Sequence, residues 1–155
     1  MMFRARLNHP LRQRPANAET GNTTPCRYAR FVIENPYAEE AEARWANEYR
    51  ASVKRFGLLT DAEQAAAIDR GEEVRDKLAA LFTEGKPADD QEIQALVKLH
   101  YEWVCLFWTP NREQYIGLGE MYGQDPRFTE FYDKKANGLA DFIGEAIRVW
   151  SEANL

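Results

Sequence analysis

Apolar side chains recur every three or four residues along most of this 155-residue chain. An α-helix turns once in about 3.6 residues, so this spacing gathers the apolar side chains on one face of a helix. No segment alternates apolar and polar residues as a half-buried strand would. The sequence therefore predicts an all-α domain of five or six helices. The clearest apolar face is that of the last helix, made of Leu139, Phe142, Ile143, Ala146, Ile147 and Trp150.

Capping residues divide this pattern into separate helices. Thr60 and Glu63 have the spacing of a capping box, and Asp125-Pro126 combines an N-cap residue with a proline suited to the first turn. Gly85-Lys86-Pro87 is typical of a helix end, because glycine adopts the conformation that follows the last turn and proline cannot continue the helix. Asn137-Gly138 likewise closes the short element that precedes the last helix.

Proline and glycine mark two further helices. Asn35-Pro36 predicts the start of the first helix, whose apolar stripe runs to about residue 56 and ends at Gly57. Thr109-Pro110-Asn111 interrupts the pattern again, and we expect its proline in the first turn of the following helix. Within that helix, Gly117 and Gly119 are expected to let a neighbouring helix approach closely.

A third helix is expected from Asp89 or Asp90 to Trp108. Its C-terminal half carries apolar residues on two faces, and Leu99, Trp103 and Leu106 form the second of these. A helix that is apolar nearly all round is usually buried on most sides. The sequence therefore predicts that this helix lies at the centre of the fold.

Charge divides the chain into two parts. Residues 1–30 contain six arginines and one glutamate, which gives a net charge of +5, whereas residues 31–155 have a net charge of −10. The first part is rich in Pro, Asn and Thr and shows no sustained apolar period, so we expect residues 1–33 to be a flexible, disordered basic leader. Residues 34–155 are expected to form the helical domain. Because the domain is acidic and the leader is too short for a helix-turn-helix, we expect no direct DNA binding by this chain.

Several features bear on the compartment. There is no run of about 18 apolar residues, so no transmembrane helix is encoded and no membrane partner is expected. The basic N-terminus lacks the apolar region of a secretory signal. Cys26 and Cys105 are the two cysteines and give no disulfide framework. The sequence therefore favours a reduced, cytoplasmic protein, and we expect a monomer.

The sequence offers little for catalysis or metal binding. His100 is the only histidine of the predicted domain, and Cys105 lies about 500° further round the same helix, so the two do not form a dyad. No second histidine, HExxH or CxxC pattern provides a metal site. Paired acidic residues fall at helix starts or on polar faces, where capping and solvation explain them. We therefore expect a protein that is not an enzyme and has no cofactor.

Aromatic residues gather in one segment of the predicted domain. Nine of the 19 Phe, Trp and Tyr residues lie between residues 99 and 132, which is more bulky rings than neighbouring helices easily cover. A single ring at helical spacing usually packs in a core, but the set predicts an aromatic-lined cleft that binds a ligand. The candidate ligand-binding residues are His100, Trp103, Phe107, Trp108, Arg112, Tyr115 and Tyr122.

Two interpretations of His100 remain. It is either a hydrogen-bonded histidine of the core, which we favour, or the polar group at the floor of the cleft. Trp108 and Tyr115 flank the helix break and are the residues best placed to stack on a ligand, with Arg112 between them as a gate or a partner for an anion.

The C-terminal half of the sequence resembles a known family. The run Tyr115-Ile116-Gly117-Leu118-Gly119-Glu120-Met121-Tyr122, followed by Asp125-Pro126-Arg127-Phe128, is similar to the C-terminal signature of the TipAS antibiotic-recognition domain. Tyr132-Asp133 and Gly138-Leu139-Ala140 extend the resemblance, and the segment 37–45 resembles the opening helix of that family. The resemblance spans about residues 34–152.

The resemblance implies an all-helical, globin-like fold with a ligand cleft between helices. Family members are effector domains of MerR-like drug-responsive activators or separate drug-binding proteins, and they bind bulky peptide-type antibiotics such as thiopeptides or albicidin. Their ligands often order helices that are mobile without ligand. The present sequence is similar to the stand-alone form. The family's thiopeptide-binding branch has a reactive cysteine near the position of Thr109-Pro110-Asn111; none is present here, so non-covalent binding is expected.

The sequence leaves a second hypothesis open. A small-molecule antibiotic or similar amphipathic ligand is the expected partner, bound for sequestration or sensing. Alternatively, the domain is a helical protein-interaction module that partners a transcription regulator on another chain, with the basic leader and the acidic body providing its contacts.

Overall fold

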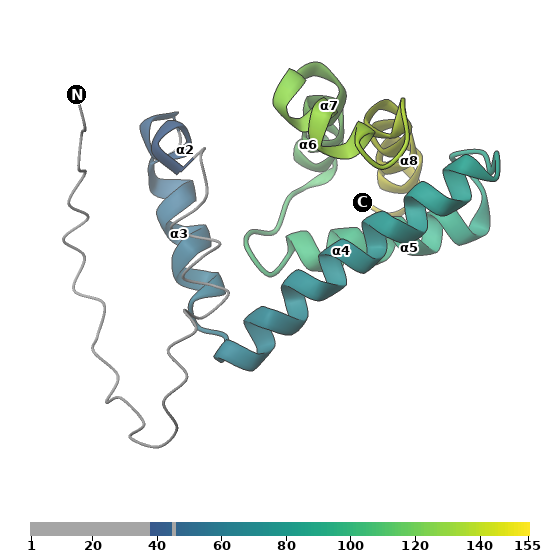
Figure 1. Cartoon of the computed structure of the whole chain (residues 1–155). Helices are drawn as coiled ribbons and strands as arrows, with labels where there is room; N and C mark the ends of the chain where they lie inside the picture. Colours follow the sequence, from purple (N-terminus) through teal and green to yellow (C-terminus); the bar gives the residue numbers. More distant parts are fainter. Residues whose placement is uncertain (1–37, 45) are drawn as a thin grey trace.

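The computed structural model describes residues 38–44 and 46–155, and every regular element within them is a helix (Figure 1). The all-α prediction is confirmed. The helices are α2 (Ala38–Arg44), α3 (Ala46–Phe56), α4 (Asp61–Thr83), α5 (Gln91–Val104), α6 (Arg112–Gln124), α7 (Pro126–Asp133) and α8 (Leu139–Asn154). These seven helices exceed the expected five or six because the segment expected as one first helix comprises α2 and α3. The leader 1–33 and the helix start at Asn35-Pro36 lie outside the described residues.

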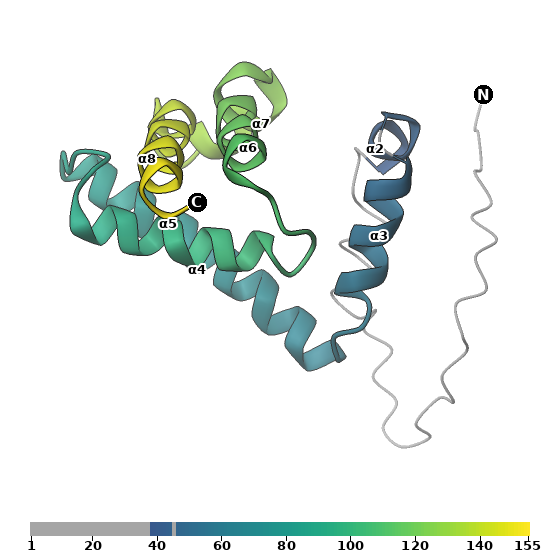
Figure 2. The ribbon, with the colours of Figure 1, turned by 180° about the vertical axis from the view of Figure 1, so that it is seen from behind.

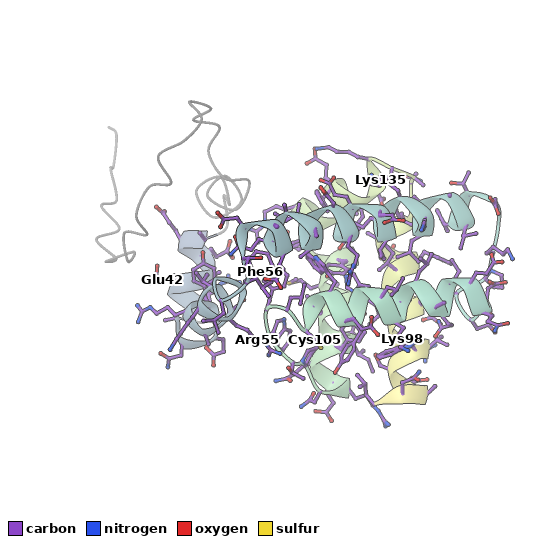
Figure 3. The ribbon with its side chains drawn as sticks, turned by 90° about the horizontal axis from the view of Figure 1, so that it is seen from below. Glu42, Arg55, Phe56, Lys98, Cys105 and Lys135 are labelled. Carbon is purple, nitrogen blue, oxygen red and sulfur yellow. The ribbon has the colours of Figure 1, made fainter. Side chains whose placement is uncertain are left out.

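Helices α4 and α5 form an antiparallel pair that carries the other elements. They lie side by side when viewed from below (Figure 3), and α6, α7 and α8 pack together on one face of this pair (Figures 1 and 2). Helices α2 and α3 stand beside this body, next to the N-terminal end of α4 (Figure 1). The core therefore lies between the α4–α5 pair and the three C-terminal helices.

Local capping follows the sequence closely. The Thr60 hydroxyl accepts a hydrogen bond from the Glu63 N–H, and the Glu63 carboxylate accepts one from the Thr60 N–H, which is the expected capping box. Asp125 caps α7, with Pro126 in its first turn. Gly85 and Gly138 have φ values of 82° and 84°, in the left-handed region that favours glycine. The boundaries predicted at Thr60, Gly85 and Asp125 are confirmed, whereas α7 ends at Asp133 and Gly138 caps the start of α8 instead of closing α7.

The start of α6 differs from the prediction. Asn111, not the residue before Pro110, is the N-cap: its side chain accepts a hydrogen bond from the Gln114 N–H, and the Gln114 side chain accepts one from the Asn111 N–H at 2.9 Å. Pro110 therefore precedes the helix instead of lying in its first turn. The asparagine side chain accepts a hydrogen bond from a free N–H group of the first turn. The helix therefore begins one or two residues later than predicted.

Helix α5 is shorter and less central than predicted. It ends at Val104, and residues 105–107 form turns before the loop to α6. Leu99 on its second face has 39% of its surface exposed, so the expectation of burial on most sides is wrong. The reason is that α6, α7 and α8 cover one face of the α4–α5 pair and leave the other face to solvent.

The most extensive helix contact joins α6 and α8, and residues of both helices belong to the apolar core. A Cβ atom on Gly119 would lie 3.2 Å from the Cα of Gly144, so the prediction of close approach is confirmed at Gly119. It is wrong at Gly117, where a Cβ would meet nothing within 4 Å. On α8 the expected apolar face is buried except for Phe142, which is half-buried. The core is built mainly from Val74, Leu78, Ile93, Val97, Tyr115, Leu139, Ile143 and Ile147.

Helices α2 and α3 contact the rest of the domain at their two ends. At the C-terminal end of α3, the buried ring of Phe56 stacks on Phe107 with centroids 4.5 Å apart, and the Arg55 guanidinium donates a hydrogen bond to the Thr109 hydroxyl at 2.9 Å. Figure 3 shows Arg55 and Phe56 where α3 meets the α4–α5 pair. On α2, the Glu40 carboxylate accepts a hydrogen bond from the Arg127 guanidinium of α7. The two-helix arm is therefore attached at both ends.

Candidate functional site

Aromatic rings form a continuous series of contacts from α3 to α7, which we call the ring chain. Adjacent rings in the series have centroids between 4.5 and 6.0 Å apart, within the range of favourable ring–ring contacts. Its members come from four helices (α3, α5, α6 and α7) and the turn after α5, so it links the two-helix arm to the body of the domain. In spatial order they are Phe56, Phe107, Trp103, His100, Tyr122, Tyr132 and Phe131.

Trp103 is held in place by a hydrogen bond and by close packing against α4. Its indole N–H donates a hydrogen bond to the carbonyl oxygen of Ala67 on α4 at 2.9 Å. The ring lies so close to α4 that a Cβ on Gly71 would stand 2.9 Å from the indole nitrogen. Trp103 is half-buried, and its ring contacts both Phe107 and His100. The α4–α5 pairing therefore holds one indole against α4 with part of its surface exposed.

His100 forms a buried polar network with two tyrosines. Its Nδ1 lies 2.7 Å from the Tyr115 hydroxyl, and its Nε2 lies 3.4 Å from the Tyr122 hydroxyl. The Tyr115 hydroxyl also donates to the carbonyl oxygen of Val97 at 3.3 Å. With the proton on Nδ1, all three contacts are satisfied, because Nδ1–H donates to Tyr115 and Nε2 accepts from Tyr122. These hydrogen bonds agree with the interpretation of His100 as a hydrogen-bonded residue of the core, which the sequence favoured.

Burial keeps this network neutral. It lowers the pKa of His100 to about 4, with a smaller contribution in the same direction from the positive charge of Arg75. Burial also raises the pKa values of the Tyr115 and Tyr122 hydroxyls well above their ordinary value. At neutral pH the network therefore consists of an uncharged imidazole and two phenols, which suits a structural role in the core better than acid–base catalysis.

The structure brings five of the seven candidate residues together. His100, Tyr115 and Tyr122 are buried, whereas Trp103 and Phe107 are half-buried at the surface of the ring chain. Trp108 and Arg112 are exposed on either side of the loop between α5 and α6, and no described ring contacts Trp108. The candidate set thus consists of three buried residues, two half-buried residues and two exposed residues at the helix break.

Phe131, the last member of the ring chain, and its neighbour Arg75 were not among the candidates from the sequence. Arg75 of α4 places its guanidinium carbon 4.4 Å from the ring centroid of Phe131, which is 48% exposed. The position of Phe131 in the aromatic-rich segment could have identified it from the sequence. No sequence feature could have identified Arg75, because a charged residue on a helix usually faces solvent.

A groove in the described structure lies away from the ring chain. It is apolar and sits on the opposite face of the α4–α5 pair, where Leu81, Leu96 and Leu99 line it between Lys77 and Glu92. The cleft expected beside the aromatic rings stays a prediction. Of the nine rings in the aromatic-rich segment, Trp108 and Phe131 are exposed, so the segment does present aromatic surface to solvent.

Metal clusters and membrane-spanning helices are both absent from the described residues. Residues 38–44 and 46–155 contain no group of three or more His, Cys, Asp or Glu side chains placed to hold a metal ion. Within the same residues, no helix has the length and apolar character needed to cross a membrane.

Comparisons with known proteins agree with the sequence resemblance. The family model of the TipAS antibiotic-recognition domain matches residues 37–150. The HTH-type transcriptional regulator SkgA of Caulobacter vibrioides is 31% identical over 130 residues, which are 81% of this chain and 48% of SkgA. The HTH-type transcriptional activator TipA of Streptomyces coelicolor is 31% identical over 114 residues, which are 72% of this chain and 45% of TipA. The chain therefore spans about half the length of the curated relatives it matches.

A solved structure has a similar fold. It is TipAS in complex with nosiheptide, described as part of a thiopeptide antibiotic multidrug resistance system from Streptomyces lividans. The two structures superpose with a TM-score of 0.69 at 26% sequence identity, and the match covers 86% of this chain and 98% of that chain. The similarity includes nearly all of the nosiheptide-binding chain.

Proposed function

Because this chain belongs to the TipAS antibiotic-recognition domain family, we propose that it binds a bulky peptide-type antibiotic without forming a covalent bond. The observation that carries the proposal is the ring chain, which presents half-buried and exposed rings on a scaffold that matches a nosiheptide-binding structure. Aromatic rings supply a large contact area at little entropic cost, so they suit ligands with extended apolar and ring-containing surfaces.

The seven candidate residues take different roles in this proposal. Trp103, Phe107 and Trp108 contact the ligand, because each presents ring surface at or near the helix break. Arg112, exposed in the first turn of α6, guards the entrance or pairs with an anionic group. The buried residues His100, Tyr115 and Tyr122 form the floor and hold the ring chain in place through their hydrogen bonds.

The proposal includes a biological role. The domain sequesters or senses the drug, as an effector domain of a transcription regulator or as a drug-binding protein, and it acts without catalysis and without touching DNA itself. We place it in the cytoplasm as a monomer with no cofactor. The neutral floor supports a binding role, since neither His100 nor its tyrosine partners are poised to exchange protons near neutral pH.

A fluorescence titration tests the proposal. Nosiheptide is added to the full chain, and tryptophan emission is followed, because Trp103 and Trp108 flank the site. We expect saturable quenching, and Trp108→Ala should weaken the affinity about tenfold, the effect of losing one stacked ring. Leu99→Ala is the matched control, since it removes an exposed apolar side chain on the opposite face of the α4–α5 pair.

The control variant also defines the results that would contradict the proposal. Binding that is lost in Leu99→Ala but kept in Trp108→Ala would place the ligand in the groove on the opposite face. A flat response of the wild-type chain to nosiheptide and to a panel of other peptide antibiotics, with a protein partner co-purifying, would favour the protein-interaction module instead.

A further inference from the structure

We propose that Arg75 and Phe131 extend the binding site, and that the Arg75 guanidinium donates hydrogen bonds to amide carbonyl oxygens of an uncharged peptide ligand. This inference rests on the proposed function and deepens it by naming the ligand chemistry at one place. The geometry that carries it is a guanidinium stacked on an exposed ring beside the half-buried Trp103.

The Arg75 side chain is held in one orientation at two points. Its Nε donates a hydrogen bond to the carbonyl oxygen of Gly71 at 3.3 Å, and its guanidinium carbon lies 4.4 Å from the centroid of Phe131. A planar guanidinium on an aromatic face is a favourable cation–π contact that leaves its edge open. The side chain is therefore fixed before any ligand arrives, which lowers the entropic cost of binding.

The terminal nitrogens of Arg75 carry N–H donors that no hydrogen bond to a described residue uses. Across residues 38–44 and 46–155, no carboxylate forms an ion pair with Arg75, and no hydrogen bond engages its Nη1 or Nη2. The carboxylate next to it in sequence, Asp76, pairs with Lys135 instead. A guanidinium carries five N–H donors, of which the Gly71 bond uses only the one on Nε.

Arg75 lies next to the ring chain. Gly71 is its link to Trp103, because the indole packs over this glycine while the Arg75 Nε bonds to the glycine's carbonyl oxygen. On its other side, Phe131 lies 5.2 Å from Tyr132, the neighbouring ring of the chain. The positive charge is also close enough to lower the pKa of the buried His100. A ligand lying across Trp103 and Phe131 would therefore pass over the guanidinium.

The charge of the domain indicates which acceptor this site takes. Residues 31–155 carry a net charge of −10, which disfavours the approach of an anionic ligand. Amide carbonyl oxygens are uncharged acceptors that every peptide ligand presents, and a charged donor makes stronger hydrogen bonds to them than a neutral donor does. The site therefore suits an uncharged peptide with aromatic groups on either side of an exposed amide.

Substitutions at Arg75 test the inference with nosiheptide as the probe. Arg75→Met keeps the aliphatic stem but removes the donors, and we expect the dissociation constant to rise at least tenfold. Arg75→Lys keeps the charge without the planar fork and should give an intermediate loss. Arg70→Met is the matched control, because it removes the same charge from an exposed position of α4, and it should stay within twofold of wild type. Circular dichroism and thermal midpoints check that each variant folds.

The outcomes separate this inference from the proposed function. A wild-type chain that shows no saturable binding would overturn both. Wild-type binding that Arg75→Met leaves within twofold would overturn the role of Arg75 alone, as would equal losses in Arg75→Met and Arg70→Met, which would indicate a general charge effect. The loss in Arg75→Met should be the same at 50 mM and 500 mM salt; a loss that shrinks at high salt would identify a carboxylate as the acceptor and overturn the assignment to an amide.

Discussion

The carbonyl oxygen of Gly119 on α6 lies so close to α8 that a Cβ atom on Gly144 would stand 2.8 Å from it. In the opposite direction, a Cβ on Gly119 would meet the Cα of Gly144 at 3.2 Å. The atoms in conflict belong to backbones that cannot rotate away as a side chain would. These two glycines therefore set the distance between α8 and α6, the helix that carries Tyr115 and Tyr122.

Substitution of Gly144 tests this crossing. Gly144→Ala should destabilise the domain by about 1–3 kcal/mol, because α8 must move away from α6 and the packing around Ile147 must loosen. Gly117→Ala is the matched control on α6: its Cβ would meet nothing within 4 Å, so it should stabilise the domain by about 0.5–1 kcal/mol through helix propensity alone. Urea unfolding followed by circular dichroism measures both changes, and equal effects at the two glycines would contradict the close crossing.

A second substitution tests how α4 positions Trp103. In Gly71→Ala the new methyl group would stand 2.9 Å from the indole nitrogen, so the ring should be displaced and its hydrogen bond to Ala67 lost. We expect a shift in tryptophan emission and at least a fivefold loss of nosiheptide affinity. In a Trp103→Phe background, Gly71→Ala should have little further effect on affinity, because the displaced group is already absent. Additive losses in the two variants would contradict this coupling.

Much of this fold could be predicted from the sequence because its helix ends depend on near neighbours. The Thr60–Glu63 capping box and the left-handed Gly85 and Gly138 involve residues only a few positions apart, so their spacing in the sequence already determines their geometry. The apolar face of α8 follows in the same way from the helical period.

Other features depend on which surfaces meet in three dimensions. Leu99 belongs to an apolar stripe, yet it is exposed because α6–α8 cover the opposite face of α5. Gly117 and Gly119 are equivalent in sequence, but only Gly119 faces α8. The Arg75–Phe131 contact joins α4 to α7 across a long stretch of chain, and local sequence carries no signal for such a pairing. The sequence located the aromatic-rich segment, but it carried no signal for which rings touch one another or for the contact between Phe107 and Phe56 of α3.

The buried histidine makes stability depend on pH in a defined direction. The pKa of His100 is about 4 in the folded state and near 6.5 when unfolded, so protons bind preferentially to the unfolded chain between these values. Stability should be greatest above pH 6.5 and should fall as the pH decreases toward 4, by about 3 kcal/mol from this group. Urea unfolding at pH 7.5, 6, 5 and 4.5 measures the slope.

A variant without the titrating group isolates this effect. His100→Gln retains hydrogen-bonding capacity but no proton to gain, so its stability, although lower at pH 7.5, should change far less between pH 7.5 and 5. The carboxylate of Asp125, whose pKa hydrogen bonds from Arg127 lower to about 2, titrates below this window. An unchanged slope in His100→Gln would show that another group is responsible.

Cys105 provides a test of non-covalent binding. The thiol is half-buried at the C-terminal end of α5, and Figure 3 shows it beside the turn that leads to α6. We expect the intact mass of the protein to be unchanged after incubation with nosiheptide and removal of the unbound drug. A stable adduct that maps to Cys105 would contradict the non-covalent proposal, and its disappearance in Cys105→Ser would confirm the site.

The ion pair between Glu40 and Arg127 should stabilise the packing of α2 against the body of the domain. Hydrogen bonds from Arg127 lower the pKa of Glu40, so the carboxylate remains charged and the contact is kept at neutral pH. Glu40→Gln weakens this contact at the α2 end of the arm while leaving the Phe56–Phe107 stacking at the α3 end intact. Amide hydrogen exchange in α2 should therefore accelerate several-fold, while α6 and α8 remain protected.

Glu39→Gln is the matched control for this prediction, because it removes the same charge from the adjacent, exposed position of α2. It should leave the exchange of α2 close to wild type. If the arm closes over a bound ligand, saturating nosiheptide should slow exchange in α2 in both variants, since the ligand then supplies contacts that replace the ion pair. Equal acceleration in Glu39→Gln and Glu40→Gln would mean that helix charge, and not the contact with Arg127, holds α2 in place.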